Sequence, residues 1–213
     1  MAARDLRTRL LRRAARAGIA LTESVAEPLT AYFELLDRWN RKINLTSLDD
    51  PDAAIDRLLL EPLIAARQLP TGPFRFMDVG SGGGSPALPL RIAAPESDLV
   101  MVESKSRKAA FLREAVRHLQ LNRAVVEAVR FEELLTRPEF HERFDLITLR
   151  AVRVETRTLF NLQAFLKIGG RLFLFRGPTG PDEPAILPPL RFSSTSPLLE
   201  PLRSRLTILE KAR

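Results

Sequence analysis

The chain contains no cysteine, and it has only two histidines, His118 and His141, among its 213 residues. The absence of cysteine excludes disulfides, thiolate metal sites, iron–sulfur clusters and a covalent cysteine nucleophile. Two histidines far apart in the sequence do not indicate a histidine-based metal site. We therefore expect a protein without a metal centre.

Long apolar runs are also missing, and none approaches the ~20 residues that a membrane-spanning helix needs. The first 18 residues, "MAARDLRTRLLRRAARAG", have no uninterrupted apolar core of the kind found in signal peptides. An Arg-rich, acid-poor start is compatible with a transit peptide, and the sequence leaves that alternative open. We expect a cytoplasmic protein that does not bind membranes.

Acidic residues are outnumbered by basic ones, 26 against 33, and the formal net charge is +7. Most of the basic residues are arginines, whose planar guanidinium binds phosphate in a bidentate manner. A basic chain of this kind suits a polyanionic partner such as nucleic acid. The alternative is that a GC-rich genome favours arginine codons.

The first seventy residues are predicted to be helical. Leucines and alanines recur at helical spacing from Ala2 to Ala17, and Gly18 is placed to end that helix. Its other face carries six arginines, which are either a phosphate-binding arm or a solvated helix face: Arg4, Arg7, Arg9, Arg12, Arg13 and Arg16. A second helix contains Tyr32 and Trp39, and a third begins at Asp50 and is expected to kink or split at Pro62.

From residue 74 onward, short apolar segments alternate with helical ones. Strands are predicted at 74–79, 98–102, 124–129, 144–149 and 171–175, and helices at 86–93, 105–120 and 155–167, with a short one near 131–135. Such alternation is typical of a doubly wound α/β sheet, and two weaker strand candidates near 190–194 and 204–210 fit an antiparallel hairpin at its end. We therefore divide the chain into a helical extension, 1–70, and an α/β domain, 71–213.

A glycine cluster follows the first predicted strand, in "MDVGSGGGSPALPL" (77–90). The cluster contains no lysine, which excludes a phosphate loop of the Walker type, and Ser85 stands where the dinucleotide fingerprint has its third glycine. An acid followed by alternating glycines, Asp78 with Gly80, Gly82 and Gly84, resembles the first motif of class I S-adenosylmethionine (SAM)-dependent methyltransferases. Glycines allow positive φ and let the backbone approach a ligand closely. SAM carries cationic groups and no phosphate, so a nearby carboxylate favours it.

A second carboxylate, Glu103, ends the second predicted strand, "DLVMVE". The end of this strand commonly places a carboxylate on the ribose hydroxyls of a nucleotide. The alternative role of Glu103 is to cap the following helix. Together, the loop and Glu103 favour SAM.

The methyl acceptor is narrowed by two further absences. Methylation at C5 of a pyrimidine requires a cysteine, and the segment after the fourth predicted strand, "FDLITLRAV" (144–152), lacks the Asn/Asp-Pro-Pro-aromatic loop typical of exocyclic-amine methyltransferases. What remains is a ring nitrogen with a free lone pair, or a hydroxyl assisted by a base. Guanine N7 fits because it is already nucleophilic and carries no proton, so it needs alignment rather than a general base.

Four segments, taken in order, resemble the RsmG (GidB) family of bacterial guanine-N7 methyltransferases for small-subunit (16S) ribosomal RNA. They are "LLDRWNRKINLTSLDDPDAAIDRLLLEPL" (35–63), the glycine loop, "RFEEL" (130–134) and "LRAV" (149–152). The resemblance implies a Rossmann-like, seven-stranded SAM-binding sheet, with the helical extension packed against it. It also implies a monomer that binds ribosomal RNA.

By the same resemblance, SAM contacts fall on Gly80 and Ser85 in the loop, on Phe131 and Glu132 after the third strand, and on Arg150 after the fourth. Gly82 and Glu103 join this set of cofactor-binding residues on the physical grounds given above. No catalytic side chain and no metal ligand is assigned.

The chain departs from the family pattern at several of these positions. The loop has Ser85 where the family has a bulky apolar residue, and a His-x-x-Asp-Ser run is replaced by residues 58–62, from Leu58 to Pro62. Arg176 stands where a lysine is expected. These changes leave two alternatives to an active ribosomal RNA methyltransferase: a non-catalytic RNA-binding or assembly factor with the same fold, and a small-molecule methyltransferase. We also expect Ser85 to cap the helix that begins at Pro86.

Overall fold

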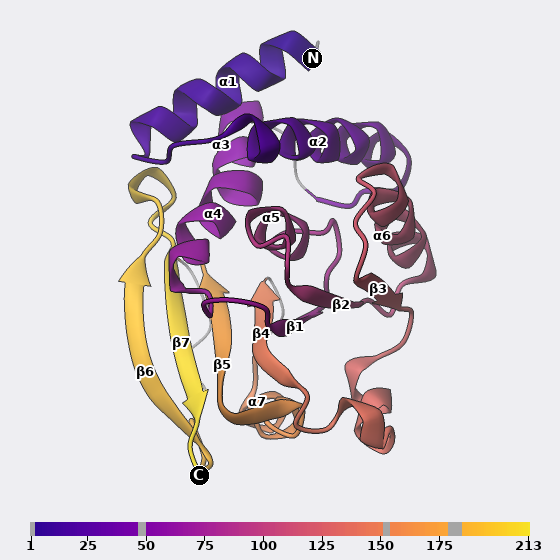
Figure 1. Cartoon of the computed structure of the whole chain (residues 1–213), viewed down its shortest axis with the longest axis vertical. Coiled ribbons are helices and arrows are strands. Elements are labelled where there is room, and N and C mark those ends of the chain that lie inside the picture. The colour runs from indigo at the N-terminus through magenta and orange to yellow at the C-terminus, as the bar shows by residue number, and fades with distance from the viewer. Residues whose placement is uncertain (1–2, 47–49, 151–153, 179–184) are drawn as a thin grey trace.

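The computed structural model describes residues 3–46, 50–150, 154–178 and 185–213. These residues contain a seven-stranded sheet in the order β3-β2-β1-β4-β5-β7-β6 (Figure 1). The strands are β1 (Arg75–Val79), β2 (Asp98–Val102), β3 (Ala124–Glu127), β4 (Phe144–Arg150), β5 (Leu166–Arg176), β6 (Leu190–Pro197) and β7 (Arg205–Lys211). The first five are parallel, and β7 pairs antiparallel with both β5 and β6. The predicted doubly wound sheet and its terminal hairpin are therefore confirmed.

The helices alternate with the strands and cover both faces of the sheet. They are α1 (Ala3–Arg16), α2 (Glu23–Ile43), α3 (Pro51–Ile55), α4 (Glu61–Ala65), α5 (Ala87–Ala93), α6 (Ser106–His118) and α7 (Thr156–Leu162). A π-helical turn, Asp56–Leu60, joins α3 to α4, and short 3-10 turns occupy Ala66–Gln68, Phe131–Thr136, Pro138–Phe140 and Glu200–Leu202. None of the helices within the described ranges is long and apolar enough to cross a membrane.

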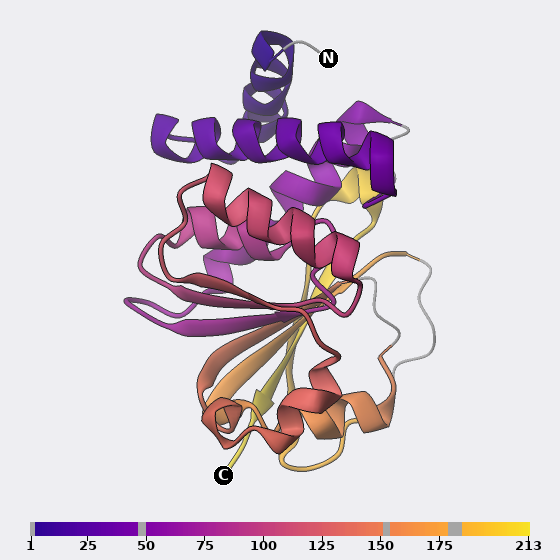
Figure 2. The same cartoon turned by 90° about the vertical axis from the view of Figure 1, so that its right-hand side faces the viewer.

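Seen from the side, the sheet is covered by α5 and α6 on one face and by α7 and the 3-10 turns at Phe131–Thr136 and Pro138–Phe140 on the other (Figure 2). The N-terminal helices lie above α5 and α6, and α1 forms the outermost layer. Because the parallel strands all end on the same side of the molecule, the loops after β1, β2 and β4 meet at one edge. Open α/β sheets bind their ligands at this edge.

The helical extension and the sheet share one hydrophobic core. Leu10 of α1, Leu29 and Leu36 of α2, Phe76 of β1 and Met101 of β2 are all nearly or fully buried and belong to the same cluster. A boundary near residue 70 remains a prediction, but the helices before it are packed as an integral layer on the sheet.

Ion pairs attach α1 to α3. The guanidinium of Arg13 donates to Asp56 (2.6 and 2.5 Å) and to Asp52 (2.8 Å), and Arg9 also reaches Asp52 (3.4 Å). The hydrogen bond from Arg13 to Asp56 raises the pKa of Arg13. Arg13 therefore holds α1 in place and is not free to bind phosphate. For this residue, the interpretation of the arginine face of α1 as a phosphate-binding arm is wrong.

Two sequence-based expectations need correction. The helix expected over 155–167 ends at Leu162, and β5 begins at Leu166, five residues before the strand that was expected. The spacing of the apolar residues at 165–167 fits a helix as well as a strand. In the structure, Gly169 (φ 77°) and a bulge in the pairing of β5 with β4 place this segment in the sheet. The kink or split expected at Pro62 is confirmed, because a π-helical turn directly before Pro62 divides the helix into α3 and α4.

Candidate active site

The glycine loop connects β1 to α5 at the carboxyl edge of the sheet. Gly80, Gly82 and Gly84 all have positive φ (74°, 50° and 88°), a conformation that other residues rarely adopt. At Gly84 a Cβ atom would also lie 2.6 Å from Leu88 Cδ1, so any side chain there would require Leu88 of α5 to move. The alternating glycines are therefore required by the path of the backbone.

Glu103 fastens the loop to the end of β2. One carboxylate oxygen accepts a hydrogen bond from the Gly82 N–H (2.9 Å), and the other accepts from the Lys105 N–H at the start of α6 (2.8 Å). Helix α6 has no side-chain cap, so Glu103 braces the turn before this helix and does not cap the helix itself. A carboxylate has about four acceptor positions, so these two bonds leave capacity for ribose hydroxyls as well.

Asp78 lies beneath the loop and not on the surface of the cavity. Its side chain is buried and accepts a hydrogen bond from Thr148 Oγ1 of β4 (2.5 Å). Burial raises its pKa to about 6, although the hydrogen bonds from Ser81 and Thr148 and the charge of Arg150 oppose the shift. The motif acid therefore links β1 to β4 directly under the glycines.

Helix α2 supports the loop from the opposite side. The hydroxyl of Tyr32 donates to the Gly83 carbonyl (2.6 Å), and a Cβ atom at Gly83 would approach Leu36 Cδ1 to 3.3 Å. The Asn40 side chain accepts hydrogen bonds from the N–H groups of Leu45 and Thr46 (2.6 and 2.9 Å). Residues 39–46 therefore shape the wall of the site that faces the glycines.

A cavity of about 170 Å³ lies between these supports. Its lining comprises Leu36, Leu45, Thr46, Arg57, Leu58, Gly80, Ser81, Gly82, Gly83, Ser85, Glu103, Lys108 and Arg150. The structure thus brings together five residues that the sequence predicts as cofactor contacts: Gly80, Gly82, Ser85, Glu103 and Arg150.

Phe131 and Glu132 do not line this cavity. Phe131 is half-buried in the 3-10 turn after β3 and packs against the core on the other face of the sheet, and Glu132 is exposed. The turn follows the carboxyl end of β3, and the assignment of both residues to cofactor binding stays a prediction.

Arg150, at the end of β4, is held by a buried network. Its guanidinium pairs with Glu61 Oε2 (2.7 Å), donates to the Arg57 carbonyl, and lies 3.3 Å from Ser85 Oγ. It also lies over the Phe175 ring, 4.5 Å from the centroid. Burial raises the pKa of Glu61, and the charge of Arg150 opposes that shift. The pair therefore fixes the position of Arg150 beside the cavity.

The departures at Pro62 and Ser85 meet in the same network. Pro62 has no N–H to offer to the Leu58 carbonyl, which lies four residues earlier. Ser85 Oγ donates to that oxygen instead (2.8 Å). Likewise, the Glu61 N–H donates to Asp56, five residues earlier, and so leaves the Arg57 carbonyl to Arg150. The expected capping of α5 by Ser85 is wrong, because its hydroxyl is used here and α5 has no side-chain cap.

The cavity fits SAM by the chemistry of its lining. Adding a Cβ atom at Gly82 would fill space between the Gly80 carbonyl (3.7 Å) and Lys108 Nζ (3.8 Å), so the glycines keep open a cradle in which a ligand can approach the backbone. Glu103 offers acceptors for ribose hydroxyls, and Arg57 and Lys108 offer cations for the methionine carboxylate. Within the described ranges no cluster of His, Asp and Glu has the arrangement of a metal site.

The family model described as rRNA small subunit methyltransferase G (GidB) matches residues 25–190, which include the whole site. The chain belongs to this family. Ribosomal RNA small subunit methyltransferase G of Chloroflexus aggregans is 38% identical over 167 residues, which cover 78% of this chain and 70% of that protein. The protein of the same name from Xylella fastidiosa strain M23 is 37% identical over 171 residues, covering 80% and 78%.

A solved structure shares the fold of this methyltransferase G family member at low sequence identity. A mutant of MtNAS in complex with S-adenosylmethionine superposes with a TM-score of 0.54 at 12% identity, covering 97% of this chain and 73% of that one. This likeness supports the class I SAM methyltransferase fold.

Several residues of the site had no signal in the sequence. Tyr32, Arg57 and Lys108 belong to helical patterns that explain their positions without any site, and Thr148 lies in a buried strand. In the sequence, Glu61 stands out only as part of a departure from the family pattern. Each acquires its role through a contact with a segment distant in the chain.

Proposed function

We propose that this methyltransferase G family member transfers the methyl group of SAM to N7 of a guanine in small-subunit (16S) ribosomal RNA. The observation that carries the proposal is the family match over residues 25–190, because it contains the glycine loop, Glu103 and Arg150 in one assembled cavity. The basic charge of the chain, +7, suits an RNA substrate. We further propose that it acts as a monomer in the cytoplasm.

When bound, SAM supplies an electrophilic methyl group on its sulfonium. The backbone at Gly80 and Gly82 would receive the methionine and ribose portions, and Glu103 would accept hydrogen bonds from the ribose hydroxyls while it continues to hold Gly82. Phe131 and Glu132 remain the proposed contacts near the adenine. Arg150, fixed by Glu61, would order the side of the cavity formed by β4 and α4.

Methylation of guanine N7 requires the protein to align the acceptor with the methyl group and requires no general base. Guanine N7 has its own lone pair and no proton to remove, so the cavity walls need only exclude water and place the acceptor in line with the methyl group. This agrees with a site in which the one strongly perturbed acid, Asp78, is buried beneath the loop and does not line the cavity. We assign no general base.

The departures at Pro62 and Ser85 support an intact site over a decayed one. A buried polar group left unpaired costs about 1–3 kcal/mol. At Arg176, Nε is buried without a hydrogen-bond partner among the described residues. Around Pro62 and Ser85, by contrast, the carbonyls of Arg57 and Leu58 and the charge of Glu61 all have partners. The non-catalytic assembly factor is therefore the less favoured alternative, and the small-molecule methyltransferase does not account for the family match.

Methylation mapping of ribosomal RNA tests the proposal directly. Cells without the gene should lose one methyl group from a guanine of the small-subunit RNA, and mass spectrometry should find it restored by the wild-type gene. A Glu103→Ala gene should fail to restore it, whereas Glu96→Ala, which alters an exposed carboxylate before β2, should succeed. An unchanged map in the deleted strain contradicts the proposal.

The alternatives predict different results with the purified protein. Calorimetric titration with S-adenosylhomocysteine should show binding by the wild type and by Glu96→Ala, and weak or no binding by Glu103→Ala. An assembly factor without cofactor would show no binding in any of the three. A small-molecule enzyme would bind the cofactor and leave the ribosomal RNA unmethylated.

A further inference from the structure

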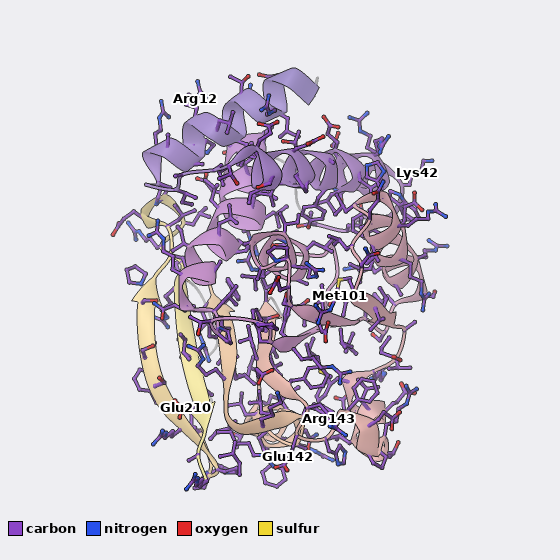
Figure 3. All side chains as sticks on the ribbon, viewed as in Figure 1. Arg12, Lys42, Met101, Glu142, Arg143 and Glu210 are labelled. Atoms are coloured by element: carbon purple, nitrogen blue, oxygen red, sulfur yellow. The ribbon has the colours of Figure 1, made fainter. Side chains whose placement is uncertain are left out.

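A groove separate from the active-site cavity lies between the C-terminal half of α2 and helix α6. Its volume is about 630 Å³. Partly buried Trp39 and Ile43 form an apolar floor, and Arg38, Arg41 and Lys42 stand on the rim, with Glu114 of α6 opposite. Figure 3 labels Lys42 at the end of α2 beside α6, with its side chain directed away from the body of the molecule.

The rim carries an excess of positive charge. Arg41 pairs with Asp37 (2.8 Å), and Glu114 pairs with Arg117, so these four charges cancel locally. Arg38 and Lys42 are exposed and make no ion pair with any residue that the structure describes. Two unpaired cations beside an apolar floor suit a ligand that joins a flat apolar group to negative charges.

Trp39 provides a rigid aromatic surface on the floor. Its ring packs edge-on against Phe111 of α6, with centroids 5.8 Å apart and planes at 64°. This contact fixes the ring while part of it stays accessible. Aromatic side chains held in this way serve as stacking platforms for the unpaired bases of RNA.

The groove and the active-site cavity are built from the same two helices. On α2, Leu36 lines the cavity and the adjacent Leu35 lines the groove. On α6, Lys108 lines the cavity and Glu114 the groove, six residues or about 9 Å along the helix axis. A ligand strand in the groove would therefore lie within a few nucleotides of the cavity.

We propose that this groove binds a single-stranded segment of the RNA substrate next to the methylated guanine. One base stacks on Trp39, and the flanking phosphates contact Arg38 and Lys42. The inference rests on the proposed function, since it assumes that the substrate is RNA. Charge complementarity favours RNA over a protein partner, for which the unpaired rim cations would have to be desolvated.

Trp39 is the only tryptophan in the chain, and its fluorescence reports on the groove directly. Titration with a single-stranded oligoribonucleotide of mixed sequence should quench the emission, because a stacked base contacts the indole. The same sequence as a duplex should quench far less. Equal quenching by both, or none by either, overturns the stacking on Trp39.

A pair of charge variants tests the rim. Arg38→Ala with Lys42→Ala should weaken binding of the labelled single strand about tenfold at low salt. It should also reduce the slope of log K against log salt by about 1.4, the value for two phosphate contacts on a single strand. The matched control, Arg143→Ala with Arg213→Ala, removes two exposed cations at the opposite end of the molecule and should change neither quantity.

The outcomes separate this proposal from the proposed function. Binding to the oligoribonucleotide is measured without cofactor, and S-adenosylhomocysteine titration should give the same affinity for the rim variant and the wild type. If the rim variant binds RNA as the control variant does, the groove proposal is wrong even though cofactor binding and methylation persist. Trp39→Phe, which keeps an aromatic platform against Phe111, should retain most of the RNA affinity that Trp39→Ala loses.

Discussion

Arg150 shows how one residue can depend on compensating changes around it. Pro62 removes an N–H donor, the π-helical turn frees a second carbonyl, and both oxygens are satisfied across the site by Ser85 and Arg150. Glu61 supplies the countercharge. Residues that look like separate departures in the sequence are one connected network in the structure.

The link between Pro62 and Ser85 can be measured by a double-mutant cycle. Ser85→Ala leaves the Leu58 carbonyl without its hydroxyl donor and should lower the free energy of unfolding by about 1–3 kcal/mol. Pro62→Ala restores an N–H four residues after Leu58, so in that background the cost of Ser85→Ala should fall by about 1 kcal/mol. Urea denaturation of the four proteins gives the coupling. Strictly additive effects would show that the two positions act independently.

Asp78 should make stability depend on pH. Its pKa in the folded protein, about 6, lies above the ordinary value of 3.8, so the folded state holds this proton more tightly than the unfolded state does. The stabilisation is therefore present at low pH and is lost as the pH rises from about 4 to about 7, by about 2 kcal/mol for this group.

Asp78→Asn isolates that contribution, because the amide oxygen can still accept the hydrogen bond from Thr148 and never ionises. The difference in unfolding free energy between wild type and variant should shift in favour of the variant by about 2 kcal/mol between pH 4 and pH 7. A difference that stays constant over this interval would mean that Asp78 titrates in the folded state as it does in the unfolded chain.

At the scale of elements, helix α2 is more than a cover for the sheet. Its buried hydroxyl at Tyr32 donates to the Gly83 carbonyl, and burial raises the pKa of Tyr32, which keeps this donor protonated. The helix that precedes the glycine loop by some fifty positions therefore sets the conformation of that loop.

Tyr32→Phe should weaken cofactor binding as well as stability. The change leaves the Gly83 carbonyl without its donor, so we expect a loss of about 1–3 kcal/mol in unfolding free energy and a lower affinity for S-adenosylhomocysteine by calorimetry. Thr30→Val is the matched control, since the Thr30 hydroxyl is buried on the same helix and donates only to Ala26 within it. Equal effects of both changes on cofactor affinity would argue against a specific role for Tyr32.

At the scale of the whole molecule, the arginines of α1 divide into two groups. Arg13 joins α1 to α3 through the buried Asp56, and Arg7 and Arg9 pair with Glu23, Asp5 and Asp52. Arg12 and Arg16 are exposed and form no ion pair with the described part of the chain. Among the α1 arginines whose side chains the structure describes, only the second group is available to an RNA partner.

Two measurements should distinguish the two groups of arginines: the free energy of unfolding and the salt dependence of RNA binding. Arg13→Ala leaves Asp56 buried without its partner and should cost about 2–3 kcal/mol of unfolding free energy, while Arg12→Ala with Arg16→Ala should cost about 0.5 kcal/mol or less. The double variant should instead reduce the salt dependence of ribosomal RNA binding. An unchanged salt slope would identify Arg12 and Arg16 as a solvated face.

The sequence by itself determined the order and type of most elements, because strand and helix periodicities and turn residues are local signals. It also determined the methyl donor, since alternating glycines after Asp78 without a lysine fit SAM and exclude a phosphate loop. Local signals failed where apolar residues fit both periods, as at Phe165, just before β5, and at Leu166, its first residue.

Only the tertiary structure decided how the site is held together. The contacts of Arg150 with Glu61, of Ser85 with Leu58 and of Tyr32 with Gly83 join segments 27 to 89 positions apart. Such contacts depend on how the N-terminal helices pack against the carboxyl edge of the sheet. Local sequence patterns, such as helix and strand periodicity, do not predict that packing. For the same reason, Arg13 pairs with Asp52 and Asp56 and stabilises the packing of α1, whereas Arg12, its neighbour on the same helix, is exposed.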